Sequence, residues 1–153
     1  EQVFFEERRK LKDKAKKEID FRIVATDHSE DAVDVSRKNA RTAGVDHLID
    51  FDVCDFADTR VPEGQGVVIF NPEYGERLGV HTKLEATYKR IGDFMKQKCK
   101  GYRGYIFTGN PDLAKKIGLR ASRRIEFYNG KLDCRLLEYE LYEGSKREPK
   151  PES

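Results

Sequence analysis

The sequence predicts an α/β fold, with helices covering a largely parallel, doubly wound sheet that ends in an antiparallel hairpin. Short β-branched segments alternate along the chain with segments whose apolar residues recur at helical spacing. The run 66–70, Gly-Val-Val-Ile-Phe, is continuously apolar, which is typical of a strand covered on both faces. Asn129-Gly130 separates two strand-like segments and is a strong hairpin signal.

Size and composition exclude several classes of protein. The chain has 153 residues, enough for one domain but not for two separate cores. It has no long uncharged apolar run, so we expect no segment that spans a membrane. Its 30 basic and 28 acidic residues nearly balance, so overall charge does not indicate nucleic acid. Cys54, Cys99 and Cys134 lie far apart without C-x-x-C spacing, which predicts no metal site, no disulfide framework and a cytoplasmic location.

The first third of the chain predicts the order helix, strand, helix. Residues 2–18 are dense in charge and indicate an exposed helix, and residues 21–26 form a short β-branched strand. Ser29 is a suitable N-cap for the next helix, and Gly44 is a suitable C-terminal residue. The inner side of that helix is expected to carry Ala32, Val33, Ser36, Asn39 and Ala40.

The remaining elements follow the same alternation until the hairpin. Strands are expected over 48–54, 66–70, 104–108, 123–128 and 131–142. Leu84, Tyr88, Ile91 and Met95 recur at helical spacing after Thr82, a suitable cap. A short helix over 112–117 ends at Gly118. The polar, proline-bearing residues 144–153 are expected to be a disordered tail.

Charge is unevenly distributed along the chain. Residues 27–58 contain nine acidic and three basic residues, whereas residues 85–135 contain thirteen basic and five acidic ones. The second half therefore offers cations along which a phosphate backbone can run. These cations include Lys96, Lys98, Lys100, Arg103, Lys115, Lys116, Arg120, Arg123 and Arg124. For 96–100 the favoured interpretation is a solvated helix face.

Ligands of open parallel sheets bind at the carboxyl ends of the strands, where this sequence places polar residues. Asp27 follows the first predicted strand and suits ribose hydroxyls, although for this residue alone a turn or cap aspartate is the favoured interpretation. His28 lies beside it. Asp55 and Phe56 follow the next strand, where a carboxylate accepts from an exocyclic amine and a ring packs on an adenine face.

The most informative strand end is 71–79, Asn-Pro-Glu-Tyr-Gly-Glu-Arg-Leu-Gly. The Asn71 amide oxygen and the Pro72 carbonyl are two acceptors that suit a planar amino group. Tyr74 then stacks on the base that carries this amine, as in flipped-base pockets. The alternative for the dipeptide alone is an ordinary Asn-Pro turn.

This nine-residue stretch resembles the Asn-Pro-Pro-Tyr-Gly-Glu-Arg-Leu-Gly signature of bacterial ribosomal RNA guanine-N2 methyltransferases. These are similar to the large-subunit methyltransferase L family of class I S-adenosylmethionine enzymes. The resemblance continues in collinear order through residues 26–32, 39–44, 108–114 and 128–137, and reaches about Glu143.

The resemblance implies a Rossmann-like class I methyltransferase domain over residues 1–143 and methyl transfer from S-adenosylmethionine to guanine N2 of 23S ribosomal RNA, with no metal required. Transfer RNA guanine-N2 methyltransferases share the Asn-Pro core and stay open as an alternative, as does an RNA-binding remnant without activity. An N-terminal RNA-binding module is expected in the full-length protein.

The resemblance also implies roles for individual residues. Asp27 and His28 would lie at the cofactor ribose, and Asp55 with Phe56 at its adenine. Asn71, which also borders the cofactor, would hold the guanine amine together with Pro72 and Tyr74.

Four residues are expected to face RNA: Glu73, Arg77, Arg123 and Arg124. An ion pair of Arg77 with Glu73 or Glu76 is the alternative to a phosphate contact.

Two departures from the family pattern qualify these expectations. None of the twelve glycines forms a glycine-rich loop after a first strand, and Glu73 stands where the family usually has a second proline. We therefore expect the chain to be the later two-thirds of a methyltransferase domain, without the first strand and its loop. As an isolated polypeptide it is expected to bind S-adenosylmethionine poorly and to be inactive.

Overall fold

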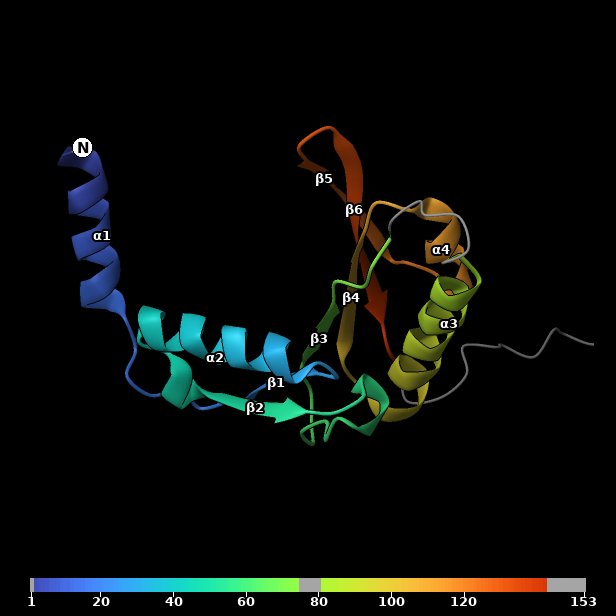
Figure 1. Ribbon diagram of the computed structural model, residues 1–153, viewed down its shortest axis with the longest axis horizontal. Coiled ribbons are helices and arrows are strands. Elements are labelled where there is room, and N and C mark those ends of the chain that lie inside the picture. The colour runs from blue at the N-terminus through green and yellow to red at the C-terminus, as the bar shows by residue number, and fades with distance from the viewer. Residues whose placement is uncertain (1, 75–80, 143–153) are drawn as a thin grey trace, which may run out of the picture. The chain divides into compact units, whose positions relative to one another are not determined.

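The computed structural model describes residues 2–74 and 81–142 (Figure 1). The predictions about Arg77 and the tail therefore lie outside the described residues. The chain divides into two compact units, Glu1–Thr59 and Arg60–Ser153, each of which is described by itself.

The first unit pairs two parallel strands with one packed helix. It consists of α1 (Gln2–Lys14), β1 (Ile23–Asp27), α2 (Glu30–Ala43), η1 (Asp46–Leu48), β2 (Ile49–Val53) and η2 (Phe56–Asp58). β1 and β2 pair from Ile23 opposite Ile49 to Asp27 opposite Val53.

Local sequence signals explain the bounds of α2. The Ser29 side chain accepts a hydrogen bond from the Ala32 N–H, and Gly44 ends the helix with a φ of +75°, so both predicted caps are confirmed. Val33 and Ala40 of the predicted inner side are buried. α1 ends at Lys14 instead of residue 18 and has no buried residue.

The second unit is a four-stranded sheet with helices. It consists of β3 (Val67–Phe70), α3 (His81–Lys98), β4 (Arg103–Thr108), α4 (Pro111–Lys116), β5 (Arg123–Asn129) and β6 (Leu132–Glu140). The strand order is β3-β4-β6-β5, with β3 parallel to β4 and β6 antiparallel to both of its neighbours.

α3 covers one face of this sheet, and α4 packs beside α3 (Figure 1). Tyr88 and Met95 of α3 are fully buried, as is Ile106 of β4. A Cβ at Gly104 would lie 2.8 Å from the Met95 sulfur, so α3 approaches the sheet where β4 lacks a side chain.

The other face of this sheet carries no helix of the same unit among the described residues. Val67 and Ile69 of β3 are each 65% exposed on that face. Within this unit, residues 66–70 are covered on one face: Val68 and Phe70 point toward α3, whereas Val67 and Ile69 point away from it, because alternate strand residues point to opposite faces.

The fold class is confirmed as mixed α/β with an antiparallel terminal hairpin. The described strands form two sheets instead of one, because β1 and β3 do not pair with each other. Thr82 lies inside α3 and is not its cap.

The hairpin turn also differs from the prediction. Asn129 is the last residue of β5 and pairs with Leu132, so the two loop residues are Gly130 and Lys131. Gly130 has a φ of +62°, which suits a two-residue hairpin turn with glycine first.

Candidate functional site

The predicted acceptor residues Asn71, Pro72 and Tyr74 lie in the loop that directly follows β3. Asn71 and Glu73 are exposed, whereas Pro72 and Tyr74 are half-buried. β3 runs parallel to β4, so this loop leaves the sheet at the same edge as the segment after β4.

That neighbouring segment begins with a second Asn-Pro dipeptide, Asn110-Pro111, which serves a structural purpose. The Asn110 side-chain oxygen accepts hydrogen bonds from the Asp112 N–H at 3.0 Å and the Leu113 N–H at 3.1 Å. Asn110 is therefore the N-cap of α4, with proline at the first helical position.

Asn71 has no such local function. Across residues 2–74 and 81–142, no hydrogen bond engages its side chain, and the amide is exposed after a strand. The Asn110 side chain thus has a structural role, whereas within the described residues both the carbonyl oxygen and the amino group of the Asn71 amide are available to a ligand.

A buried hydrogen-bond network supports the segment after β4. Thr108 is only 2% exposed, and its hydroxyl lies 2.8 Å from the Tyr88 hydroxyl while accepting from the Asn110 N–H at 3.1 Å. The pKa of Tyr88 is raised overall, chiefly because the side chain is buried. The nearby Tyr74 adds to this rise, and the hydrogen bond to Thr108 opposes it. Tyr88 therefore stays a neutral phenol that links α3 to β4.

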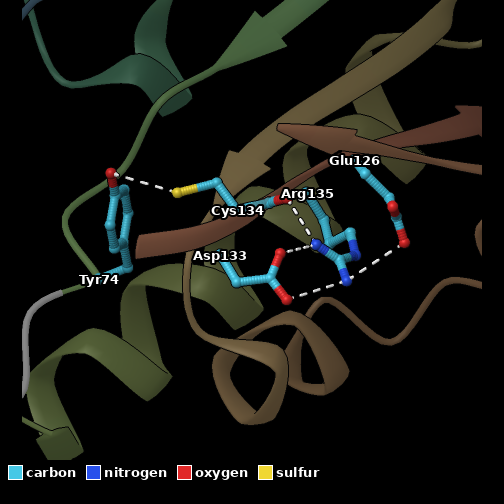
Figure 2. Close-up of polar contacts among 5 residues, drawn as sticks. All are labelled: Tyr74, Glu126, Asp133, Cys134 and Arg135. Atoms are coloured by element: carbon cyan, nitrogen blue, oxygen red, sulfur yellow. Dashed lines mark hydrogen bonds and ion pairs between the residues drawn. The ribbon is translucent and has the colours of Figure 1, made fainter. Parts of the chain in front are cut away.

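Tyr74 contacts the terminal hairpin (Figure 2). The Cys134 thiol lies 3.9 Å from the Tyr74 hydroxyl oxygen, and the Asn129 side-chain amide donates to the same oxygen at 3.5 Å. Asn129 and Cys134 were not among the predicted site residues. In the sequence the Asn129-Gly130 pair is a hairpin signal, and in the structure the Asn129 side chain also contacts Tyr74 in the loop after β3.

Gly109 is a third residue that the sequence reasoning did not assign to the site. A Cβ there would lie 2.9 Å from a Tyr74 ring carbon. Gly109 does not have a positive φ, so backbone conformation does not require glycine at this position. A glycine after a strand that no turn explains is the sequence signal that points to such a close approach.

The two predicted cofactor carboxylates lie at the ends of adjacent parallel strands of the first unit: Asp27 is the last residue of β1, and Asp55 comes two residues after β2. The Cys54 N–H donates to the Asp27 carbonyl at 3.0 Å, which joins the carboxyl ends of β1 and β2. Asp27 and Asp55 therefore lie at the same edge of this two-stranded sheet, where ligands of parallel sheets bind.

Both carboxylates also shape the backbone beside them. Asp27 Oδ1 accepts from the Ser29 N–H at 2.8 Å and lies 3.5 Å from Nδ1 of the exposed His28. Within the described part of the chain, only this oxygen of the Asp27 carboxylate has a partner. Asp55 caps η2 by accepting from the Ala57 N–H at 2.9 Å, which places Phe56, half-buried, next to it.

Arg123 and Arg124 are exposed neighbours on the edge strand β5 and point to opposite faces of the sheet. Several other predicted phosphate-binding cations are instead paired with carboxylates: Lys96 with Asp93, Arg103 with Glu138, Lys115 with Asp112 and Lys116 with Glu85. These pairs favour the solvated-surface interpretation for those cations.

The described residues contain neither a cluster of metal-ligating side chains nor a helix that could span a membrane. There, no three or more His, Cys, Asp or Glu side chains gather as metal ligands would. In the same part of the chain, no helix combines the length and the apolar character needed to cross a bilayer. All three cysteines are free.

Comparisons with known proteins place these features in context. Residues 1–138 match the family described as UPF0020, RMKL-like, methyltransferase domain. A ribosomal RNA large subunit methyltransferase K/L of Syntrophotalea carbinolica is 39% identical over 125 residues, which are 79% of this chain and 18% of that protein. A putative RNA methyltransferase of Synechocystis is 39% identical over 117 residues, which are 76% of this chain and 30% of that protein.

A solved structure of a putative methyltransferase complexed with SAH is also similar. It superposes with a TM-score of 0.79 at 26% identity, covering 95% of this chain and 38% of that one. The chain thus spans between about a fifth and two-fifths of the length of these proteins.

Proposed function

The chain belongs to the UPF0020 family of RMKL-like methyltransferase domains, and we propose that the protein containing it methylates guanine N2 in large-subunit ribosomal RNA. The names of its relatives, ribosomal RNA large subunit methyltransferase and putative RNA methyltransferase, support RNA as the substrate. S-adenosylmethionine is the proposed methyl donor, because a similar structure holds SAH, the form that has lost the methyl group.

One observation carries the assignment of the acceptor site. Two Asn-Pro dipeptides follow two paired parallel strands, and only Asn110 uses its side chain to cap a helix. In this proposal the Asn71 amide oxygen and the Pro72 carbonyl each accept a hydrogen bond from the guanine amine. They thereby orient the nitrogen lone pair, and Tyr74 stacks on the base.

The residues of the first unit fit the proposed cofactor. The second oxygen of the Asp27 carboxylate is available for ribose hydroxyls, with His28 beside it. Asp55 and Phe56 follow the adjacent strand and would bind the adenine amine and ring. The cofactor supplies an activated methyl group when bound. The protein's contribution is to hold and orient the amine, which needs no metal.

RNA contacts are proposed for Glu73, Arg77, Arg123 and Arg124. Arg123 and Arg124 face opposite sides of an edge strand, so together they suit a phosphate backbone that passes around that edge. We also propose that the full-length protein carries a separate RNA-binding module and works in the cytoplasm, where its free cysteines stay reduced.

Mass mapping of modified guanosines tests this function directly. Ribosomal and transfer RNA are compared between cells with and without the gene. Loss of one N2-methylguanosine from large-subunit RNA is the expected result. Loss from transfer RNA instead would support the transfer RNA alternative, and no loss in either would support an inactive remnant.

A matched pair of variants of the full-length protein tests the acceptor site. Asn71→Ala should abolish methylation and leave the fold intact, because its exposed side chain has no structural partner among the described residues. Asn110→Ala should retain methylation at reduced stability. Wild-type turnover by Asn71→Ala would refute the proposed role of this residue.

A further inference from the structure

The Tyr74 ring packs against residues that are far from it in sequence. On one side Gly109 leaves room for the ring, since a Cβ there would be 2.9 Å from Cε2 and 3.0 Å from Cδ2. Phe107 meets the ring edge-on, with centroids 6.4 Å apart, and Phe127 continues this aromatic cluster at 5.9 Å from Phe107. These contacts with Gly109 and Phe107 therefore restrain the plane of the ring.

The hydroxyl end of the ring is held by the terminal hairpin. Asn129 ends β5 and Cys134 lies in β6, and both direct a donor to the Tyr74 oxygen. The other side of β6 is braced by ion pairs (Figure 2). There Arg135 bonds both oxygens of Asp133 and lies 3.5 Å from the Glu126 carboxylate on β5. The two donors thus belong to strands β5 and β6, which are joined by backbone pairing and by the ion pair of Arg135 with Glu126.

We propose that this hairpin is a positioning element for the methyl acceptor, acting through the Tyr74 hydroxyl. This inference rests on the proposed function. Asn129 and Cys134 hold the Tyr74 ring in position through its hydroxyl. Tyr74 in turn positions the target base relative to Asn71. Neither Asn129 nor Cys134 needs to touch the RNA for this role.

The chemistry of methyl transfer makes such positioning consequential. Reaction requires the amine nitrogen in line with the methyl group, and a misplacement of about 1 Å can cost on the order of a hundredfold in rate. If the two donors are removed, the ring keeps its stacking surface but loses the contacts that fix its outer end. The turnover number should then fall more than the affinity for the cofactor.

A double-mutant cycle in the full-length protein tests the proposal. Tyr74→Phe removes only the hydroxyl, and Asn129→Ala removes one donor. Each should lower kcat/KM for RNA by about threefold to fivefold, toward the lower end of what one net hydrogen bond contributes, because the contacts to the Tyr74 oxygen are 3.5 and 3.9 Å long. The double variant should be no slower than Tyr74→Phe, because both changes remove the same contact. Lys131→Arg, an exposed change in the same turn that keeps the positive charge, is the control and should stay within about twofold.

Fluorine NMR of protein labelled with 3-fluorotyrosine gives a readout that does not depend on turnover. The resonance missing from Tyr74→Phe identifies Tyr74. It should move in Asn129→Ala and in Cys134→Ala and stay in place in Lys131→Arg. Multiplicative losses in the double variant, or a Tyr74 resonance unmoved by Asn129→Ala, would overturn the proposal. A wild-type protein that methylates no RNA would instead overturn the proposed function, and the resonance would still report whether the hairpin holds Tyr74.

Discussion

Substitution of Gly92 by alanine should change the stability of α3 through two opposing effects, a higher helix propensity and a steric clash with the end of α4. Gly92 lies in the middle of α3, where it faces the end of α4. A Cβ at this position would be 1.9 Å from the Ile117 carbonyl oxygen and 2.8 Å from its carbonyl carbon. Real Cβ contacts are essentially never shorter than 3.0 Å, so one of the two helices has to move by roughly 1 Å.

The magnitude follows from comparing the two effects. Alanine is the better helix former by about 1 kcal/mol, which alone would stabilise α3. Overpacking costs about 1–3 kcal/mol and more where the neighbour cannot yield. Here the neighbour is backbone, and Leu113 and Ile117 of the adjoining segment are fully buried. We therefore expect Gly92→Ala to lower the free energy of unfolding by about 1–2 kcal/mol.

Urea-induced unfolding followed by circular dichroism measures this change. Lys89→Ala, an exposed substitution in the same helix, is the control and should alter the free energy of unfolding by no more than about 0.5 kcal/mol. If Gly92→Ala were more stable than wild type, helix propensity would dominate and the packing argument would be refuted.

Three further predictions concern the cap, pH and cofactor binding. Asn110→Ala should lower the free energy of unfolding by about 1 kcal/mol because two N–H groups of α4 lose their acceptor, whereas Asn71→Ala should change it by less than about 0.5 kcal/mol; equal losses in urea unfolding would contradict the distinction. Burial raises the pKa of Cys99 from 9.0 to about 11, so between these two pH values the thiol ionises in the unfolded chain but stays neutral in the folded one. The free energy of unfolding is therefore unaffected by this group below pH 9 and decreases above pH 9. The loss should be about 1.4 kcal/mol per pH unit up to pH 11, and urea unfolding at pH 8, 9 and 10 should show a shallower decline in Cys99→Ala. Isothermal titration of the 153-residue chain with S-adenosylmethionine should show no tight stoichiometric binding, since no glycine-rich loop follows a strand in this sequence; a tight one-to-one isotherm would contradict this.

Features that depend on neighbouring residues were predictable from the sequence. The caps of α2 are contacts between near neighbours, the apolar side of α3 is visible as helical spacing within one segment, and the terminal hairpin is marked by its turn residues. The carboxylates after β1 and β2 were also predictable as neighbours, because the ends of adjacent parallel strands meet at one edge of a sheet.

The cap formed by Asn110 is a local contact with the two N–H groups that follow it two and three residues later, whereas only the tertiary structure showed that the Asn71 amide has no partner in the described residues. The same holds for Tyr74, whose partners Asn129 and Cys134 lie 55 and 60 residues away. Local hydrogen bonds and side-chain periodicity can be recognised within a short stretch of sequence. Contacts across a sheet depend on strand order and register, which no short window contains.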